Sequence, residues 1–139
     1  MRILALIALG WTTSLSLAAG KPTAVRHQPE QPKPGVPVLV TTRLAEGTSR
    51  PILKVQAVAP GKYIRKSDPS YEKEWTDLPM HDDGRDGDEK AGDGVYSVLV
   101  PASYQRHRWL VRYRVVATDT AGKEVRAPAP DEECPNFAW

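Results

Sequence analysis

The segment RHRWLVRYRVVATDTAGKEVRAP, residues 106–128, decides the predicted fold. Its apolar residues recur at every second position, as in a strand with one buried face. The residues predicted to point inward are Val111, Tyr113, Val115 and Ala117. Arg112 and Arg114 alternate with them and are predicted to form a solvated strand face. Residues 119–122 then supply turn-forming types, so the segment predicts a β-hairpin.

Three further segments, residues 36–44, 52–60 and 95–101, alternate in the same way and predict strands. The first two flank the turn EGTSRP, residues 46–51, and are predicted to pair as a hairpin. Residues 75–80 predict a short, Pro-bent strand. The connection before them is long for a compact domain, so its aromatic residues are expected to pack over the sheet edge.

No segment repeats apolar residues every three or four positions. The sequence therefore predicts an all-β fold, an immunoglobulin-like antiparallel β-sandwich of about six to seven strands, over residues 36–127. Residues 21–35 are rich in proline and predict an extended lead-in. Residues 128–139 are Pro-rich and acidic, and predict a tail or linker and not a strand.

Residues 1–20 have the pattern of a cleaved signal peptide, with Arg2, an apolar run and small residues at the end. The unbroken apolar part, residues 3–11, is far shorter than the roughly 20 residues that span a bilayer. The predicted product is therefore exported, to the periplasm, the cell surface or the medium, with no stable membrane span. Cys134 is the single cysteine, so an internal disulfide is excluded.

The stretch HDDGRDGDEKAGDGVYSVLV, residues 81–100, combines clustered carboxylates with glycines. Calcium binds carboxylate and carbonyl oxygens in loops of this kind. The candidate calcium ligands are Asp82, Asp83, Asp86, Asp88 and Asp93. A calcium-loop pattern that starts at Asp82 fails at its third position, which is Gly84. Three Asp-Gly dipeptides support the alternative of tight turns, and both interpretations can hold together.

Catalytic chemistry has little support in the sequence. Paired catalytic carboxylates need different environments, and residues 81–94 contain no apolar residue besides Ala91 to bury one of them. The three histidines have no metal-ligand spacing, and neither a nucleophile elbow nor a phosphate loop occurs. Without residues 1–20 the chain keeps 18 of its 19 basic side chains against 17 acidic ones. This near-neutral balance argues against nucleic acid as the partner of the basic run 106–114, although an acidic partner or glycan could use it.

The stretches PMHDDGRDGDEKAGDGVYSVLVPA and LVRYRVVATDTAGKEVRAP together resemble an Ig-like module of large exported planctomycete-type bacterial proteins. In that family the module precedes a spore-coat-protein-H-type (CotH) kinase domain. The stretches VRHQPEQPKPGVPVLVTTRL and YIRKSDPSYEKEWTDLPM are also similar to it, so the resemblance covers residues 25–139. The family's kinase domain has no counterpart here, and the resemblance implies no catalytic residue in this chain.

The predicted function is that of a non-enzymatic exported Ig-like accessory or spacer module, for binding or presentation outside the cytoplasm. Its partner would be a protein or a glycan. One alternative is the N-terminal fragment of a CotH-like secreted kinase, with the kinase-like domain encoded separately. A second alternative is a calcium-stabilised adhesion module.

Overall fold

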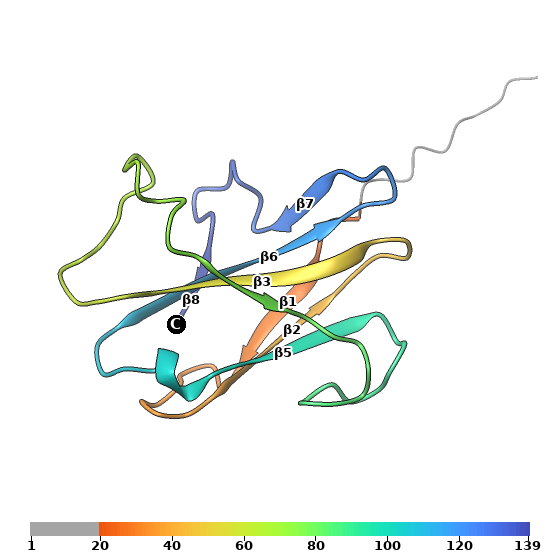
Figure 1. The fold of residues 1–139 in the computed structure, drawn as a ribbon, viewed down its shortest axis with the longest axis horizontal. Helices are drawn as coiled ribbons and strands as arrows, with labels where there is room; N and C mark the ends of the chain where they lie inside the picture. Colours follow the sequence, from red (N-terminus) through yellow and green to blue (C-terminus); the bar gives the residue numbers. More distant parts are fainter. Residues whose placement is uncertain (1–19) are drawn as a thin grey trace, which may run out of the picture.

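The computed structural model describes residues 20–139, which form two antiparallel β-sheets. The three-stranded sheet has the order β1-β2-β5. The five-stranded sheet has the order β4-β3-β6-β7, and β8 also pairs with β6. Figure 1 shows the two layers, with β3 and β6 in one and β2 and β5 in the other. The strands are β1 Thr23–Gln28, β2 Val38–Arg43, β3 Ser49–Val58, β4 Thr76–Pro79, β5 Val95–Val100, β6 Leu110–Thr118, β7 Glu124–Ala127 and β8 Phe137–Ala138.

This architecture confirms the predicted immunoglobulin-like β-sandwich, with eight strands among residues 20–139. One 3-10 turn, η1 Ala102–Tyr104, follows β5. Within the part of the chain that the structure describes, no helix has the length and apolar character to cross a membrane. The predicted signal peptide lies outside the described residues, except for Gly20.

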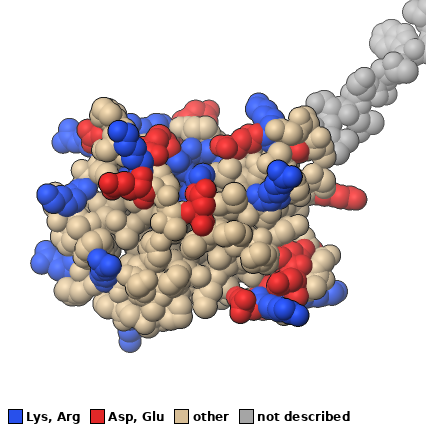
Figure 2. Space-filling view, viewed as in Figure 1, with Lys and Arg blue, Asp and Glu red and all other residues tan. Residues whose placement is uncertain are grey.

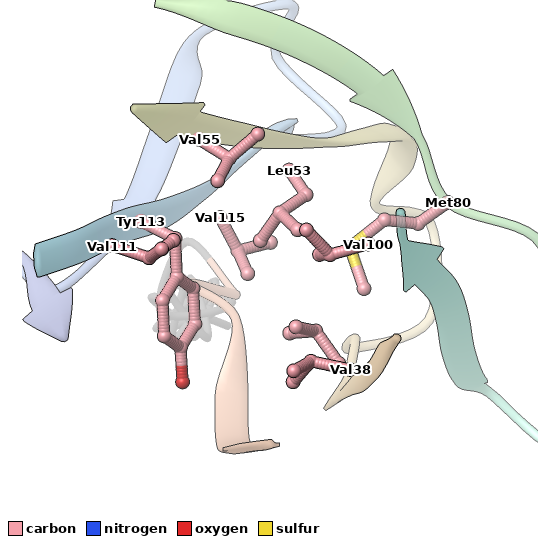
Figure 3. Close-up of a cluster of buried hydrophobic side chains, with 9 residues drawn as sticks. Val38, Leu53, Val55, Met80, Val100, Val111, Tyr113 and Val115 are labelled. Atoms are coloured by element: carbon pink, nitrogen blue, oxygen red, sulfur yellow. The ribbon is translucent and has the colours of Figure 1, made fainter. Parts of the chain in front are cut away.

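The core fills the space between the two sheets, where alternate side chains of β2, β3 and β6 meet (Figure 3). Full burial of one aliphatic side chain contributes about 1.5–3 kcal/mol, so a strand that alternates apolar and polar residues is held with its apolar face inward. The buried cluster consists of Val38, Val40, Leu53, Val55, Met80, Val100, Val111, Tyr113 and Val115.

The hairpin predicted from residues 106–128 is confirmed as β6 and β7, which pair from Val115↔Ala127 to Thr118↔Glu124. Asp119 shapes the turn between them. Its Oδ1 accepts hydrogen bonds from the backbone N–H groups of Ala121 and Lys123, each at 2.9 Å. The short strand predicted within residues 75–80 is β4.

The predicted pairing of residues 36–44 with residues 52–60 is wrong. Each segment forms a strand, but β2 pairs with β1 and β5, whereas β3 pairs with β4 and β6. The turn between them carries the chain from one sheet to the other, so their apolar faces meet across the core. The alternating pattern predicts which side chains are buried. It does not predict whether two strands pair within one sheet or lie in opposite sheets, because both arrangements give the same pattern.

Both ends of the described chain contribute strands that the sequence analysis did not predict. In the lead-in, β1 runs antiparallel to β2, with His27 opposite Val40. In the tail, β8 pairs with β6, with Phe137 opposite Tyr113. A two-residue strand is too short to show alternation, and the prolines around β1 conceal its pattern.

The predicted solvated face of β6 is also wrong. Arg112 and Arg114 point away from the core as expected, yet they are only 7% and 5% exposed. The connection between β3 and β4 folds over the outer face of the five-stranded sheet and covers them. Tyr71 and Trp75 of that connection therefore pack over the face of β6 and not over the sheet edge, with Arg112 4.6 Å from the Tyr71 ring and Arg114 4.2 Å from the Trp75 ring.

Candidate functional site

The acidic stretch, residues 81–94, forms the loop that connects β4 of the five-stranded sheet to β5 of the three-stranded sheet. His81 and Ser97 exchange two backbone hydrogen bonds of 2.9 and 2.8 Å, which fix the start of the loop beside β5. The loop then folds against the outer face of β2. At Gly87, which has a φ of +95°, an added Cβ would lie 2.5 Å from Leu39 Cδ1, so this approach requires glycine. Figure 2 shows the acidic atoms gathered over this loop, at the lower right.

The carboxylates of this loop bind its own backbone. Asp82 accepts three N–H bonds, from Gly92 at 2.6 Å, Asp93 at 3.3 Å and Gly94 at 3.0 Å. Asp88, which is 7% exposed, accepts one from Gly84 at 2.6 Å. These bonds hold the loop ends together, as the tight-turn interpretation predicts.

Of the five candidate calcium ligands, the structure brings three together. Each of Asp82, Asp88 and Asp93 offers one carboxylate oxygen, and these oxygens lie within 4.8 Å of one another. Calcium binds oxygens at about 2.3–2.6 Å, so oxygens on one ion lie up to about 5 Å apart, and the three carboxylates fit this spacing. Asp83 and Asp86 are exposed and do not belong to the group among the described residues.

A second polar cluster lies on the outer face of the five-stranded sheet. We call it the arginine layer; it consists of Arg112, Arg114 and Arg126. Burial lowers the pKa of Arg112 and of Arg126. Glu72 forms an ion pair with Arg114, and the hydrogen bond from Arg114 lowers the pKa of Glu72.

The remaining contacts of the arginine layer hold loops in place. Arg112 Nε donates to Gln56 Oε1 at 2.6 Å, and Arg112 Nη1 donates to the Ile64 carbonyl at 3.3 Å. Arg126 donates to the carbonyls of Pro128 and Pro135 at 3.0 and 2.8 Å. The layer thus ties the β3–β4 connection and the C-terminal tail to the sheet.

The third cluster is aromatic and lies where β1, β6 and the C-terminal tail meet. His27 Nδ1 and Tyr113 Oη are 2.8 Å apart, and burial raises the pKa of Tyr113. The Trp139 ring lies 5.0 Å from both the His27 ring and the Tyr113 ring. The sequence analysis missed this cluster because both β1 and β8 were predicted as strand-free segments.

Beside this cluster the surface has a pocket of about 330 Å³. Its walls come from the Pro-rich segment before β2, from the turn that precedes β6, and from Trp139. The lining residues are Glu30, Gln31, Pro32, Pro34, Gln105, Arg106, His107, Arg108, Trp109 and Trp139. The run 106–109 was visible in the sequence as basic and aromatic, but its partners at residues 30–34, far earlier in the chain, were not.

Two facing antiparallel sheets with these connections define an Ig-like β-sandwich domain. Residues 64–127 match the family model of the conditioned medium factor second Ig-like domain. The match runs from the β3–β4 connection to the end of β7 and includes the acidic loop and the arginine layer. Comparison with curated proteins and with solved structures found no match.

Proposed function

We propose that this protein is an exported, non-catalytic Ig-like module that binds or presents a partner outside the cytoplasm. The Ig-like fold and the partial match to an Ig-like domain of conditioned medium factor support it. The observation that carries the proposal is the binding of the Asp82 carboxylate by three backbone N–H groups. A carboxylate that accepts hydrogen bonds from the backbone of its own loop shapes that loop, which supports a structural role for the acidic stretch.

Purified residues 21–139 provide the test of the non-catalytic part. The chain should unfold in one cooperative transition, because its single core joins both sheets. It should also leave ATP unchanged over hours of incubation. ATP hydrolysis that co-purifies with the folded protein would overturn the proposal.

The export part rests on the pattern of residues 1–20. A fusion of residues 1–30 to a reporter enzyme that is active only after export should give activity. The processed product should begin at Lys21 or Gly20 by N-terminal sequencing. Reporter retained inside the cell, with the segment still attached, would contradict export.

The association with a CotH-type kinase domain is the finer part of the proposal and rests on the sequence resemblance. A kinase-like reading frame directly downstream in the genome would support it. An unrelated neighbour would favour a module that acts without a kinase.

A second candidate function, a calcium-stabilised module, is favoured by the convergence of Asp82, Asp88 and Asp93. A ligand that binds only the folded state stabilises it by mass action, about 2.7 kcal/mol at 100 times its Kd. The thermal midpoint should therefore rise in millimolar calcium relative to chelator. Asp93→Asn should reduce this rise, whereas Glu89→Gln, an exposed control in the same loop outside the three-residue group, should retain it. An equal midpoint with calcium and with chelator would remove the candidate.

A further inference from the structure

The pocket beside Trp139 is held together by contacts between segments that are distant in the sequence. Gly35 N donates to the Gln105 carbonyl at 2.9 Å, which joins the segment before β2 to the turn before β6. Backbone bonds between Trp139 and Val111, of 3.0 and 3.1 Å, fix the third wall against β6. The pocket volume of about 330 Å³ is within the range of small-molecule sites.

A polar group without a partner lies in the pocket wall. Gln105 is 7% exposed, and its Oε1 accepts a hydrogen bond from Trp139 Nε1 at 2.6 Å. That bond fixes the orientation of the amide, and Gln105 Nε2 is left buried with no hydrogen-bond partner. Buried N–H groups are nearly always paired, so this donor is free to bind an acceptor atom, which a ligand in the pocket can supply.

The pocket also has a cationic, aromatic rim. The Arg106 guanidinium lies 4.5 Å from the Trp109 ring. Arg108 is exposed and has a φ of +63°, a left-handed conformation that non-glycine residues rarely adopt. Glu30 is the one acidic side chain among the lining residues, against two arginines.

The indole rings, the buried amide donor and the exposed guanidinium of the pocket each favour one chemical feature of a ligand. Indole rings held in fixed orientations pack well against the flat C–H face of a sugar ring. A buried amide donor binds a hydroxyl or ring oxygen, and an exposed guanidinium binds a carboxylate through two parallel hydrogen bonds. The indole, amide and guanidinium groups of the lining match the C–H face, the oxygens and the carboxylate of an acidic sugar.

We propose that this pocket binds an acidic saccharide, a unit of uronic-acid type. Its ring packs on Trp139, one of its oxygens accepts from Gln105 Nε2, and its carboxylate pairs with Arg108. The inference deepens the proposed binding function and rests on it for the location outside the cytoplasm.

The probe is the trisaccharide of galacturonic acid, with its fully methyl-esterified form as a neutral ligand of the same backbone. Calorimetric or NMR titration of residues 21–139 should show the acid binding about tenfold or more tightly than the ester, as expected for one charge-assisted bond. Equal affinities, or no binding of the acid up to about 10 mM, would overturn the proposal. An acidic hexapeptide that binds as tightly as the trisaccharide would also overturn it in favour of a peptide site.

Arg108→Gly removes the guanidinium and at the same time relieves the positive φ, so the variant should fold. Arg50→Gly is its matched control, because Arg50 is also an exposed arginine with positive φ, at +54°, and lies at the start of β3 outside the pocket lining. Arg108→Gly should weaken trisaccharide binding about tenfold, and Arg50→Gly should leave it within about twofold. Equal losses in the two variants would show nonspecific charge attraction and refute the site. Failure of these titrations with a folded, ATP-inert protein would leave the proposed module in place.

Discussion

The acidic loop and the arginine layer are both charged clusters on outer sheet faces, yet they are built in opposite ways. The acidic loop is mostly exposed, and its carboxylates accept hydrogen bonds from the loop's own backbone. Arg112 and Arg114 of the arginine layer are buried and bind Ile64 and Glu72 of the β3–β4 connection, which are distant in the sequence. Charge density in the sequence therefore indicates neither burial nor function, which depend on what covers the cluster.

The arginine layer also contains buried polar atoms that have no hydrogen-bond partner, and the acidic loop contains none among the described residues. Arg112 Nη2 and Arg114 Nε are buried without a hydrogen-bond partner. Their charge is compensated by Glu72 and by the rings of Tyr71 and Trp75. Cation–π contacts are stronger when the cation is removed from water, which explains how like charges are tolerated side by side.

Arg112→Ala should therefore give the largest loss of stability, about 3 kcal/mol, by chemical denaturation. The substitution removes the packing against Tyr71 and leaves the buried Gln56 Oε1 without its donor. Arg43→Ala, at an exposed arginine of β2, is the control and should cost less than about 0.5 kcal/mol. Similar losses in both variants would mean that the arginine layer is not a structural element.

Asp82→Ala should have the next largest effect, a loss of about 2 kcal/mol. It removes the acceptor of three backbone N–H groups, although water can replace part of these bonds in an exposed loop. Asp82→Asn keeps one acceptor oxygen and should cost less. The control is Glu89→Ala in the same loop, which should stay within about 0.5 kcal/mol of the wild type. Equal effects of Asp82→Ala and Glu89→Ala would show that the loop does not depend on its internal bonds.

Sequence patterns predicted the elements whose periodicity is determined by burial. The residues of β6 that were predicted to point inward, Val111, Tyr113, Val115 and Ala117, are buried as predicted, because the strand alternates over several residues against one core. Strand partners were not predictable in the same way, as the placement of β2 and β3 in different sheets shows.

In the candidate sites, too, contacts between residues distant in the sequence could not be predicted from sequence patterns. The carboxylates of the acidic loop are near neighbours in the sequence, so their meeting in space could be anticipated. The arginine layer and the pocket are formed by residues far apart in the chain, such as Arg112 with Tyr71, and Gln105 with Trp139. Their composition follows from the packing of the loops and could not be read from local spacing.

The smallest predicted effect concerns Glu72, the exposed acidic member of the arginine layer's ion pair. Its side chain is 62% exposed, so solvent screening limits its ion pair with Arg114 to less than about 1 kcal/mol. Because the hydrogen bond from Arg114 lowers the pKa of Glu72 below its ordinary value of 4.5, the folded state binds the proton less readily than the unfolded state. The stabilisation is therefore present above pH 4.5 and is lost as the pH falls through the lowered pKa.

Glu72→Gln should accordingly be slightly less stable than the wild type at pH 7, and the difference should shrink as the pH falls below 4.5. Denaturation curves of both proteins between neutral pH and about pH 3 provide the measurement. Glu74→Gln is the control for the loss at pH 7, since Glu74 is an exposed glutamate in the same connection and forms no ion pair among the described residues. A difference in the free energy of unfolding between Glu72→Gln and wild type that grows toward low pH would contradict this prediction. It would mean that the protonated carboxyl group of Glu72, and not its ion pair with Arg114, stabilises the arginine layer.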